Sequence, residues 1–259
     1  MRVLCIGDVF GRPGRDALLA TLPALRRSQA IDLVIANGEN SAHGAGLTSA
    51  TGRSLFAAGV DVITTGNHVW QRREALDYVE REPRVIRPLN YPPGTPGRGS
   101  ALVRVGAVPV LVLNAMGRLF MKPLDDPFRA LDDALAEAGS NVKVILVDFH
   151  AEATSEKRAM GFYLDGRVSV VFGTHTHVPT ADQQILPKGT GYVTDLGMVG
   201  VRRSVIGMAV EPVLAGFTTM LPNHAQPAEG SVDVNSVVVE IDADNGKATS
   251  IARLDYHVE

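Results

Sequence analysis

The sequence predicts a layered α/β fold, an αββα sandwich in which two mixed sheets are flanked by helices. Two observations lead to this expectation. Short apolar runs rich in Val and Ile alternate with helical patterns through the first third of the chain. These runs are continuously apolar, which is typical of strands covered on both faces. We expect early strands and late hairpins to form two sheets under outer helices, in one domain of residues 1–259.

Three strand and helix pairs open the chain. The apolar runs and the periodic segments that follow them predict strand 3–7 before helix 16–27, strand 33–37 before helix 49–58, and strand 60–65 before helix 73–81. Each strand is followed by a helix, which is the order that parallel strands require.

The pattern changes after Pro88. A Gly/Pro-rich loop at 91–99 precedes two strands, 101–105 and 108–114, whose connection at Gly106-Ala107 predicts a tight hairpin. Pro127 and Gly139 stand at start and stop positions of a helix over 128–138. The remaining expected elements are strands at 142–149 and 168–172 and a terminal hairpin of 234–241 and 248–256, turning at Asp244-Asn245-Gly246.

Composition excludes several functional classes. The 259 residues carry 25 basic and 28 acidic side chains, a net charge of −3 with no long basic stripe, so we expect no long nucleic acid as a partner. The one cysteine, Cys5, allows neither an intramolecular disulfide nor a thiolate zinc site. No signal peptide and no apolar stretch near the ~18 residues of a membrane span is evident, so we expect a cytoplasmic protein without membrane contact.

Polar residues of the kind that bind metals follow five of the expected strands. Because the carboxyl ends of strands in an α/β sheet form a shared crevice, residues far apart in the sequence converge there. The residues are Asp8, Glu39, Asn40, Asn67, His68, His150, His175 and His177.

Spacing adds a geometric expectation. If segment 173–177 is extended, His175 and His177 project to the same side and share one cluster. Asn67 and His68 are adjacent and would point in different directions, so that one binds metal while the other faces a substrate.

Each residue also has a structural interpretation. His150 alone is typical of a hydrogen-bonded structural histidine, and Asp8 and Asn40 are also turn formers or helix caps. Glu39 is harder to explain in this way, because an unpaired carboxylate directly after a buried strand is costly. The coincidence at five strand ends favours a metal site.

The motifs resemble those of the calcineurin-like metallophosphoesterases. The matching segments, in order, are Gly7-Asp8, Gly38-Glu39-Asn40, Gly66-Asn67-His68, His150 and Gly173-Thr174-His175-Thr176-His177. Gly-Asp-Val-Phe-Gly-Arg-Pro-Gly-Arg and Asn-Gly-Glu-Asn resemble, more narrowly, the YmdB-type 2′,3′-cyclic-nucleotide 2′-phosphodiesterases. The usual Asp-x-His of the superfamily is Asp8-Val9-Phe10 here, and Asn40 would replace the missing imidazole through its carbonyl oxygen.

The resemblance implies a centre of two divalent or trivalent metal ions, with iron first and manganese next. Asp8, Glu39, Asn40 and His177 would hold one ion, and Glu39, Asn67, His150 and His175 the other, with Glu39 bridging. Two divalent ions, two carboxylates and a bridging hydroxide leave a charge of about +1, which suits a phosphodiester. The hydroxide would attack phosphorus, and His68 would protonate the leaving oxygen. The implied substrates are small phosphodiesters such as 2′,3′-cyclic nucleotides, hydrolysed to 3′-phosphomonoesters.

Several alternatives remain open from the sequence. Arg12 and Arg15 would meet phosphate or be exposed helix-start residues, His43 would face substrate or solvent, and Asp195 would orient a ligand or cap a turn. Segment 198–217 would cover the site or contact another subunit of a homo-oligomer. The rival functions are a metal-binding regulatory or scaffold protein with little turnover and a metal-dependent amidohydrolase, in which a His-x-His pair comes early and not late.

Overall fold

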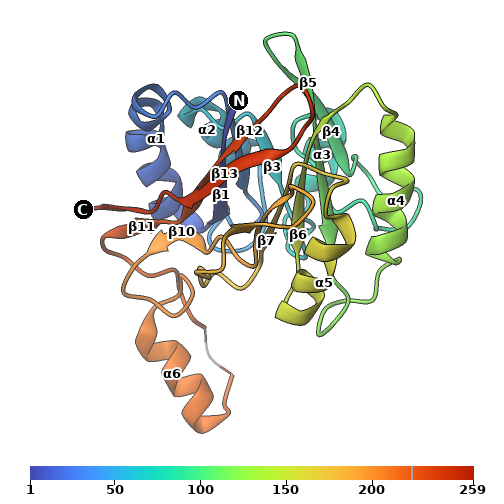
Figure 1. Cartoon of the computed structure of the whole chain (residues 1–259). Helices are drawn as coiled ribbons and strands as arrows, with labels where there is room; N and C mark the ends of the chain where they lie inside the picture. The colour runs from blue at the N-terminus through green and yellow to red at the C-terminus, as the bar shows by residue number, and fades with distance from the viewer. Residues whose placement is uncertain (223) are drawn as a thin grey trace.

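The structure, a computed structural model, describes residues 1–222 and 224–259. Two β-sheets pack face to face, with α1 and α2 outside one sheet and α4 and α5 outside the other (Figure 1). This arrangement confirms the predicted α/β sandwich of two mixed sheets. The helices are α1 (Gly11–Ser28), α2 (Ser49–Ala58), α3 (Ala75–Arg81), α4 (Pro127–Ala138), α5 (Thr154–Leu164) and α6 (Val210–Thr219).

The first sheet is centred on β1. Strands β2 and β3 run parallel to β1 on one side, and the antiparallel hairpin of β12 and β13 lies on the other. The end of β1 pairs in parallel with β10, which continues to β11 and β14. The strands are β1 (Arg2–Val9), β2 (Leu33–Asn37), β3 (Val62–Thr64), β10 (Met198–Val201), β11 (Val232–Val234), β12 (Ser236–Ile241), β13 (Ala248–Arg253) and β14 (Tyr256–Val258).

The second sheet has the order β4-β5-β6-β7-β9-β8. Its inner strands β5, β6, β7 and β9 are parallel, and the edge strands β4 and β8 are antiparallel to their neighbours. The carboxyl ends of β6 and β7 therefore lie at one end of this sheet. The strands are β4 (Ser100–Val105), β5 (Val108–Met116), β6 (Val144–His150), β7 (Val170–Thr174), β8 (Gln184–Ile185) and β9 (Gly191–Val193).

Side-chain alternation explains why the strands are apolar on both faces. In β1, Val3 and Cys5 face the second sheet, whereas Leu4 and Ile6 pack against α1 and α2. A third apolar cluster joins the outer face of the second sheet to α4 and α5. Successive residues of a strand point to opposite faces, so a strand between two packed layers needs apolar residues at every position.

Helix boundaries follow local signals. Thr48 and Thr51 form a capping box at the start of α2, and Gly59 ends this helix in the left-handed region with φ 109°. In contrast, α1 begins at Gly11, five residues before the predicted start. Pro13 lies in its first turn, where a missing N–H costs little, and Gly14 is required because a Cβ there would lie 2.3 Å from the Val199 carbonyl oxygen.

The sequence did not predict α5, β8, β9, β10, α6 or β11. The predicted strand 248–256 is divided into β13, which pairs with β12, and the start of β14, which pairs with β11. Segment 198–217, expected to cover the site or contact another subunit, supplies the core strand β10 and then α6. Helix α6 projects from the body of the molecule (Figure 1), and none of its residues is buried. A contact between α6 and another subunit stays a prediction. Within residues 1–222 and 224–259, the structure has no helix that combines the length and the hydropathy of a membrane span.

Candidate metal centre

The fold brings the strand-end residues of both sheets to one place. Asp8 comes from the end of β1, Glu39 follows β2, and Asn67 follows β3, all in the first sheet. His150 is the last residue of β6, and His175 follows β7, both in the second sheet. Asp8, Glu39 and His150 have no exposed surface, so polar groups from distant segments meet in a buried position.

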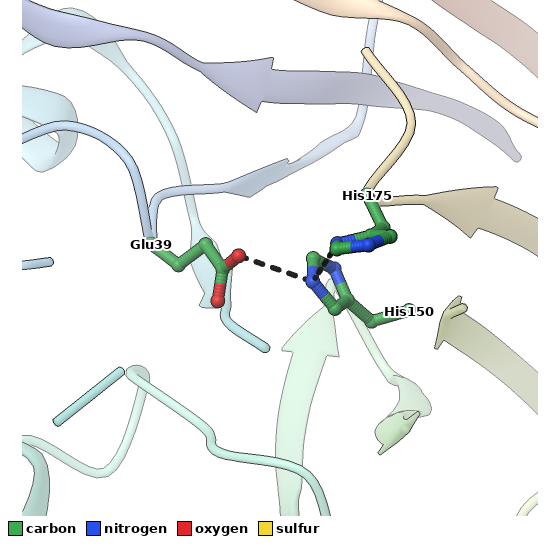
Figure 2. A group of neighbouring side chains, drawn as sticks. All are labelled: Glu39, His150 and His175. Carbon is green, nitrogen blue, oxygen red and sulfur yellow. Dashed lines mark hydrogen bonds and ion pairs between the residues drawn. The ribbon is translucent and has the colours of Figure 1, made fainter. Parts of the chain in front are cut away.

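One half of the centre is built around His150. Its Nε2 atom lies 3.0 Å from Glu39 Oε1, 2.8 Å from Asn67 Oδ1 and 3.1 Å from His175 Nδ1. Figure 2 shows the His150 imidazole between the carboxylate of Glu39 and the ring of His175. Ligand atoms of Glu39, His150 and His175 lie within 4.8 Å of one another, close enough to hold one ion.

The other half contains Asp8, Asn40 and His177. His177 Nε2 lies 3.7 Å from Asp8 Oδ1 and accepts a hydrogen bond of 3.0 Å from Asn40 Nδ2. The rings of Phe10 and His177 pack edge to face, with their centroids 5.6 Å apart. Phe10, which stands at the position of the superfamily histidine, thus supports the His177 ring by packing.

The backbone of the two late histidines differs from the expected extended segment. His175 and His177 have φ angles of 99° and 64°, in the left-handed region that non-glycine residues seldom adopt. The two rings therefore reach the centre from a tight turn. The Asp8 Oδ2 atom accepts a hydrogen bond of 3.1 Å from the His175 N–H, which ties this turn to β1.

The hydrogen bonds of His177 and the absence, within the part of the chain that the structure describes, of donors to two buried carboxylate oxygens fit a metal site. His177 Nδ1 donates to the Ile206 carbonyl oxygen at 2.9 Å, which leaves the lone pair of Nε2 facing Asp8. Among the described residues, Asp8 Oδ1 and Glu39 Oε1 are buried without a hydrogen-bond donor. Burying an acceptor atom without a donor costs free energy of folding. Cations bound beside these two oxygens would remove that cost.

The pKa shifts of the buried carboxylates and imidazoles also favour a metal site. Burial raises the pKa of Asp8 well above its usual value, and the charges of Asp195 and Glu39 raise it further. Burial also raises the pKa of Glu39. It lowers the pKa of His150 well below its usual value and, with the neighbouring His150, lowers that of His175 to about 3. Cations would stabilise the ionised carboxylates and bind the neutral imidazoles.

His68 stands at the accessible edge of this cluster. Its N–H donates to Glu39 Oε2 at 2.9 Å, and its Nδ1 lies 2.7 Å from Asn40 Oδ1. The side chain is 34% exposed, and its Nε2 atom has no partner among the residues that the structure describes. His68 is thus bonded through its backbone N–H and Nδ1, while part of its side chain stays accessible to solvent.

The four residues for which the sequence left two roles possible lie in different parts of the structure. Arg12 is exposed, pairs with Asp16 and lines a surface cleft together with His43. Arg15 donates to the carbonyl oxygen of Ser41, so it supports the turn that carries Glu39 and Asn40. Asp195 is 1% exposed and bonds Lys157 and the backbone, so it orients structure around the histidine turn.

The sequence pattern did not predict a group of polar residues beneath the centre. Asn37, Thr64, Asp148 and Thr174 have no exposed surface and hydrogen-bond one another between the sheets. Lys157, on the unpredicted helix α5, is 1% exposed. The available signal was Asp148, a carboxylate inside an otherwise apolar strand, where a buried charge requires partners.

The two-sheet fold with carboxylate, amide and imidazole groups at its strand ends defines a metallophosphoesterase, a class of phosphoric ester hydrolases. A family model described as a YmdB-like protein matches residues 4–254. The chain belongs to this YmdB-like family, which confirms the resemblance found in the motifs.

Similar sequences and solved structures match this chain over nearly its whole length. The chain is 48% identical over 254 residues to the Bacillus subtilis protein named 2′,3′-cyclic-nucleotide 2′-phosphodiesterase, covering 98% of this chain and 96% of the relative. The crystal structure of a hypothetical protein from Thermus thermophilus matches with a TM-score of 0.94 and 48% identity over 100% of both chains. A structure described as a novel phosphatase from Mycoplasma pneumoniae has a TM-score of 0.94 and 34% identity, covering 100% of this chain and 94% of that one.

Proposed function

We propose that the chain hydrolyses 2′,3′-cyclic nucleotides to 3′-phosphomonoesters at a centre of two metal ions. The observation that carries the proposal is the pair of buried oxygens, Asp8 Oδ1 and Glu39 Oε1, that lack donors among the described residues and face imidazole nitrogens. The activity of the Bacillus subtilis relative, as its name states it, supports the substrate class.

The proposed ligands follow the two halves of the cluster. Asp8, Asn40 and His177 would hold one ion, Asn67, His150 and His175 would hold the other, and Glu39 would bridge both. The Asn40 oxygen faces His68 in this structure, so its use as a ligand requires a half-turn of the amide. Imidazole, carboxylate and amide ligands without thiolate favour iron or manganese over a structural zinc site.

When bound, the ions supply a nucleophile from water at neutral pH and stabilise charge on the phosphoryl oxygens. The bond from phosphorus to the 2′ oxygen breaks as the new bond to the water oxygen forms. His68 is the proposed proton donor to the departing 2′ oxygen, because Asn40 holds its Nδ1 and its side chain is partly exposed beside the centre. The product is then a free 2′ hydroxyl beside a 3′-phosphate.

The test measures turnover of 2′,3′-cyclic nucleotides and metal content on the same preparations. We expect His68→Ala to lower turnover by about 10²–10⁴-fold while the metal content stays at the wild-type value. Full turnover in His68→Ala would remove this residue from the mechanism. Bound metal without turnover of any phosphodiester in the wild-type protein would favour the regulatory or scaffold alternative.

A further inference from the structure

Four buried polar residues connect the two sheets directly beneath the centre. We call Asn37, Thr64, Asp148 and Thr174 the inter-sheet polar cluster. They come from β2, β3, β6 and β7, two from each sheet, and none has exposed surface. Most side chains between the sheets are apolar, such as those of Cys5, Ile35 and Phe172, so a group of hydrogen-bonded polar residues there is unexpected.

The Asp148 carboxylate is the acceptor at the middle of the cluster. Thr174 Oγ1 donates to Asp148 Oδ1 at 2.6 Å, and Thr64 Oγ1 donates to Oδ2 at 2.5 Å. Asn37 Nδ2 also donates to Oδ2, at 3.3 Å. Donors from β2, β3 and β7 therefore meet on a single carboxylate of β6, which fixes the lateral position of one sheet against the other.

Thr174 links this carboxylate to the metal centre. Its Oγ1 lies 2.9 Å from His150 Nδ1. A hydroxyl has one hydrogen, and that of Thr174 goes to Asp148, so Thr174 accepts a hydrogen bond from His150 Nδ1–H. In a neutral imidazole the proton on Nδ1 leaves a lone pair on Nε2. This atom lies 2.8 Å from Asn67 Oδ1 and 3.0 Å from Glu39 Oε1, two acceptors that this tautomer leaves for a cation to satisfy.

Each member of the cluster also lies close in sequence to a strand-end residue of the centre. Asn37 precedes Glu39 by two positions, and its Oδ1 accepts a hydrogen bond of 3.1 Å from the Glu39 N–H. Thr174 directly precedes His175. A carboxylate between two apolar sheet faces adds little to stability compared with a well-packed apolar side chain, so stability alone does not account for Asp148.

We propose that the inter-sheet polar cluster is a positioning device for the metal centre, in which Asp148, through Thr174, holds His150 in the Nδ1–H tautomer with Nε2 free to bind an ion. The proposal rests on the proposed function for its purpose, whereas the tautomer is measured independently of turnover. Asp148 and Thr174 are positioning residues that act through His150.

The first measurement is the tautomer of His150 in the metal-free full chain, by long-range nitrogen–proton NMR with labelled histidine. The His150→Gln variant assigns the signal. We expect the Nδ1–H form in the wild-type protein and in Thr174→Ser, which keeps the hydroxyl. We expect Thr174→Val, of nearly the same shape, to shift the ring toward the Nε2–H form. Thr64→Val is the matched control, because it removes a donor to Asp148 that does not touch His150.

A second variant keeps the test decisive if Thr174→Val does not fold. In Asp148→Asn the side-chain oxygen would stay with Thr64 and Asn37, which are donors, and the NH₂ group would face Thr174. The hydroxyl of Thr174 would then donate to His150 Nδ1, and the ring would change to the Nε2–H form.

Calorimetric titration with Mn²⁺ measures the consequence for the centre. We expect Thr174→Val to bind Mn²⁺ about 10–100-fold more weakly, with affinity restored in Thr174→Ser and nearly unchanged in Thr64→Val. The proposal is overturned if Thr174→Val keeps the Nδ1–H form, or if Thr64→Val loses as much affinity as Thr174→Val. Wild-type protein with the expected tautomer but no Mn²⁺ binding would contradict the proposed function and leave the tautomer assignment standing.

Discussion

Lys157 and Asp195 form a buried ion pair immediately behind the turn that carries the two late histidines. Lys157 Nζ lies 2.5 Å from Asp195 Oδ2, and each residue is 1% exposed. Lys157 also donates to the Thr174 carbonyl oxygen at 2.8 Å, and Asp195 accepts from the Thr176 hydroxyl at 2.7 Å. The pair thus hydrogen-bonds the residues before and after His175. These bonds stabilise the left-handed backbone conformation of His175.

Removal of one partner should be strongly destabilising. We expect Lys157→Met to lower the free energy of unfolding by about 3–5 kcal/mol, because Asp195 would remain as an uncompensated buried charge. Urea unfolding measures the loss. Arg12→Ala is the control, since Arg12 and Asp16 form an exposed pair whose loss should cost at most about 1 kcal/mol. Equal losses in the two variants would contradict the structural role given to the buried pair.

Gly66 is expected to be essential for the position of His150. A Cβ at this residue would lie 2.2 Å from both Cδ2 and Nε2 of the His150 ring. Gly66→Ala should therefore displace the ring and weaken Mn²⁺ binding by about 10–100-fold, measured by calorimetric titration.

Gly94→Ala provides the comparison for Gly66→Ala. Gly94 has φ 85°, and among the described residues no atom lies within 4 Å of a Cβ built there. This variant should lose about 1–2 kcal/mol of stability through backbone strain and keep its affinity for Mn²⁺. If Gly66→Ala also kept full affinity, His150 would not be held where the structure has it.

Cys5 should be unreactive in the native protein. It has no exposed surface, and burial, with the nearby Asp148 charge, raises the pKa of its thiol well above the ordinary value. We expect no reaction with a thiol reagent under native conditions at pH 8 and one thiol per chain in denaturing urea. The neutral thiol leaves stability unchanged near neutral pH, and the raised pKa lowers stability only as the pH rises above the unfolded-state value. Rapid native labelling would contradict the packing of β1 between the two layers.

The sequence predicts the convergence of the site because parallel strands place their carboxyl ends together. Asp8, Glu39 and Asn67 lie at or just after the ends of three parallel strands of one sheet, and His150 and His175 lie at or just after the ends of two parallel strands of the other. The same reasoning fails for the shape of segment 173–177. An extended conformation accounts for the spacing of its histidines, but tertiary contacts to Asp8 and Asp195 select a turn instead.

Helix α5 shows a second limit of the sequence pattern. Its buried face includes the charged residues Glu156 and Lys157, so the sequence lacks the apolar periodicity that usually predicts a helix. Both are buried because partners elsewhere in the chain satisfy them. The Glu156 carboxylate accepts hydrogen bonds from the N–H groups of Arg118 and Leu119, and Lys157 pairs with Asp195. Such partners are known only once the chain is folded.

The bridging role proposed for Glu39 is tested most directly by elemental analysis of the wild-type protein and of Glu39→Gln after loading with iron or manganese. The neutral amide keeps the shape of the side chain but removes the charge that two cations would share. We expect about two ions per wild-type chain and a loss of both ions in Glu39→Gln. Two ions in both proteins, or none in the loaded wild type, would contradict it.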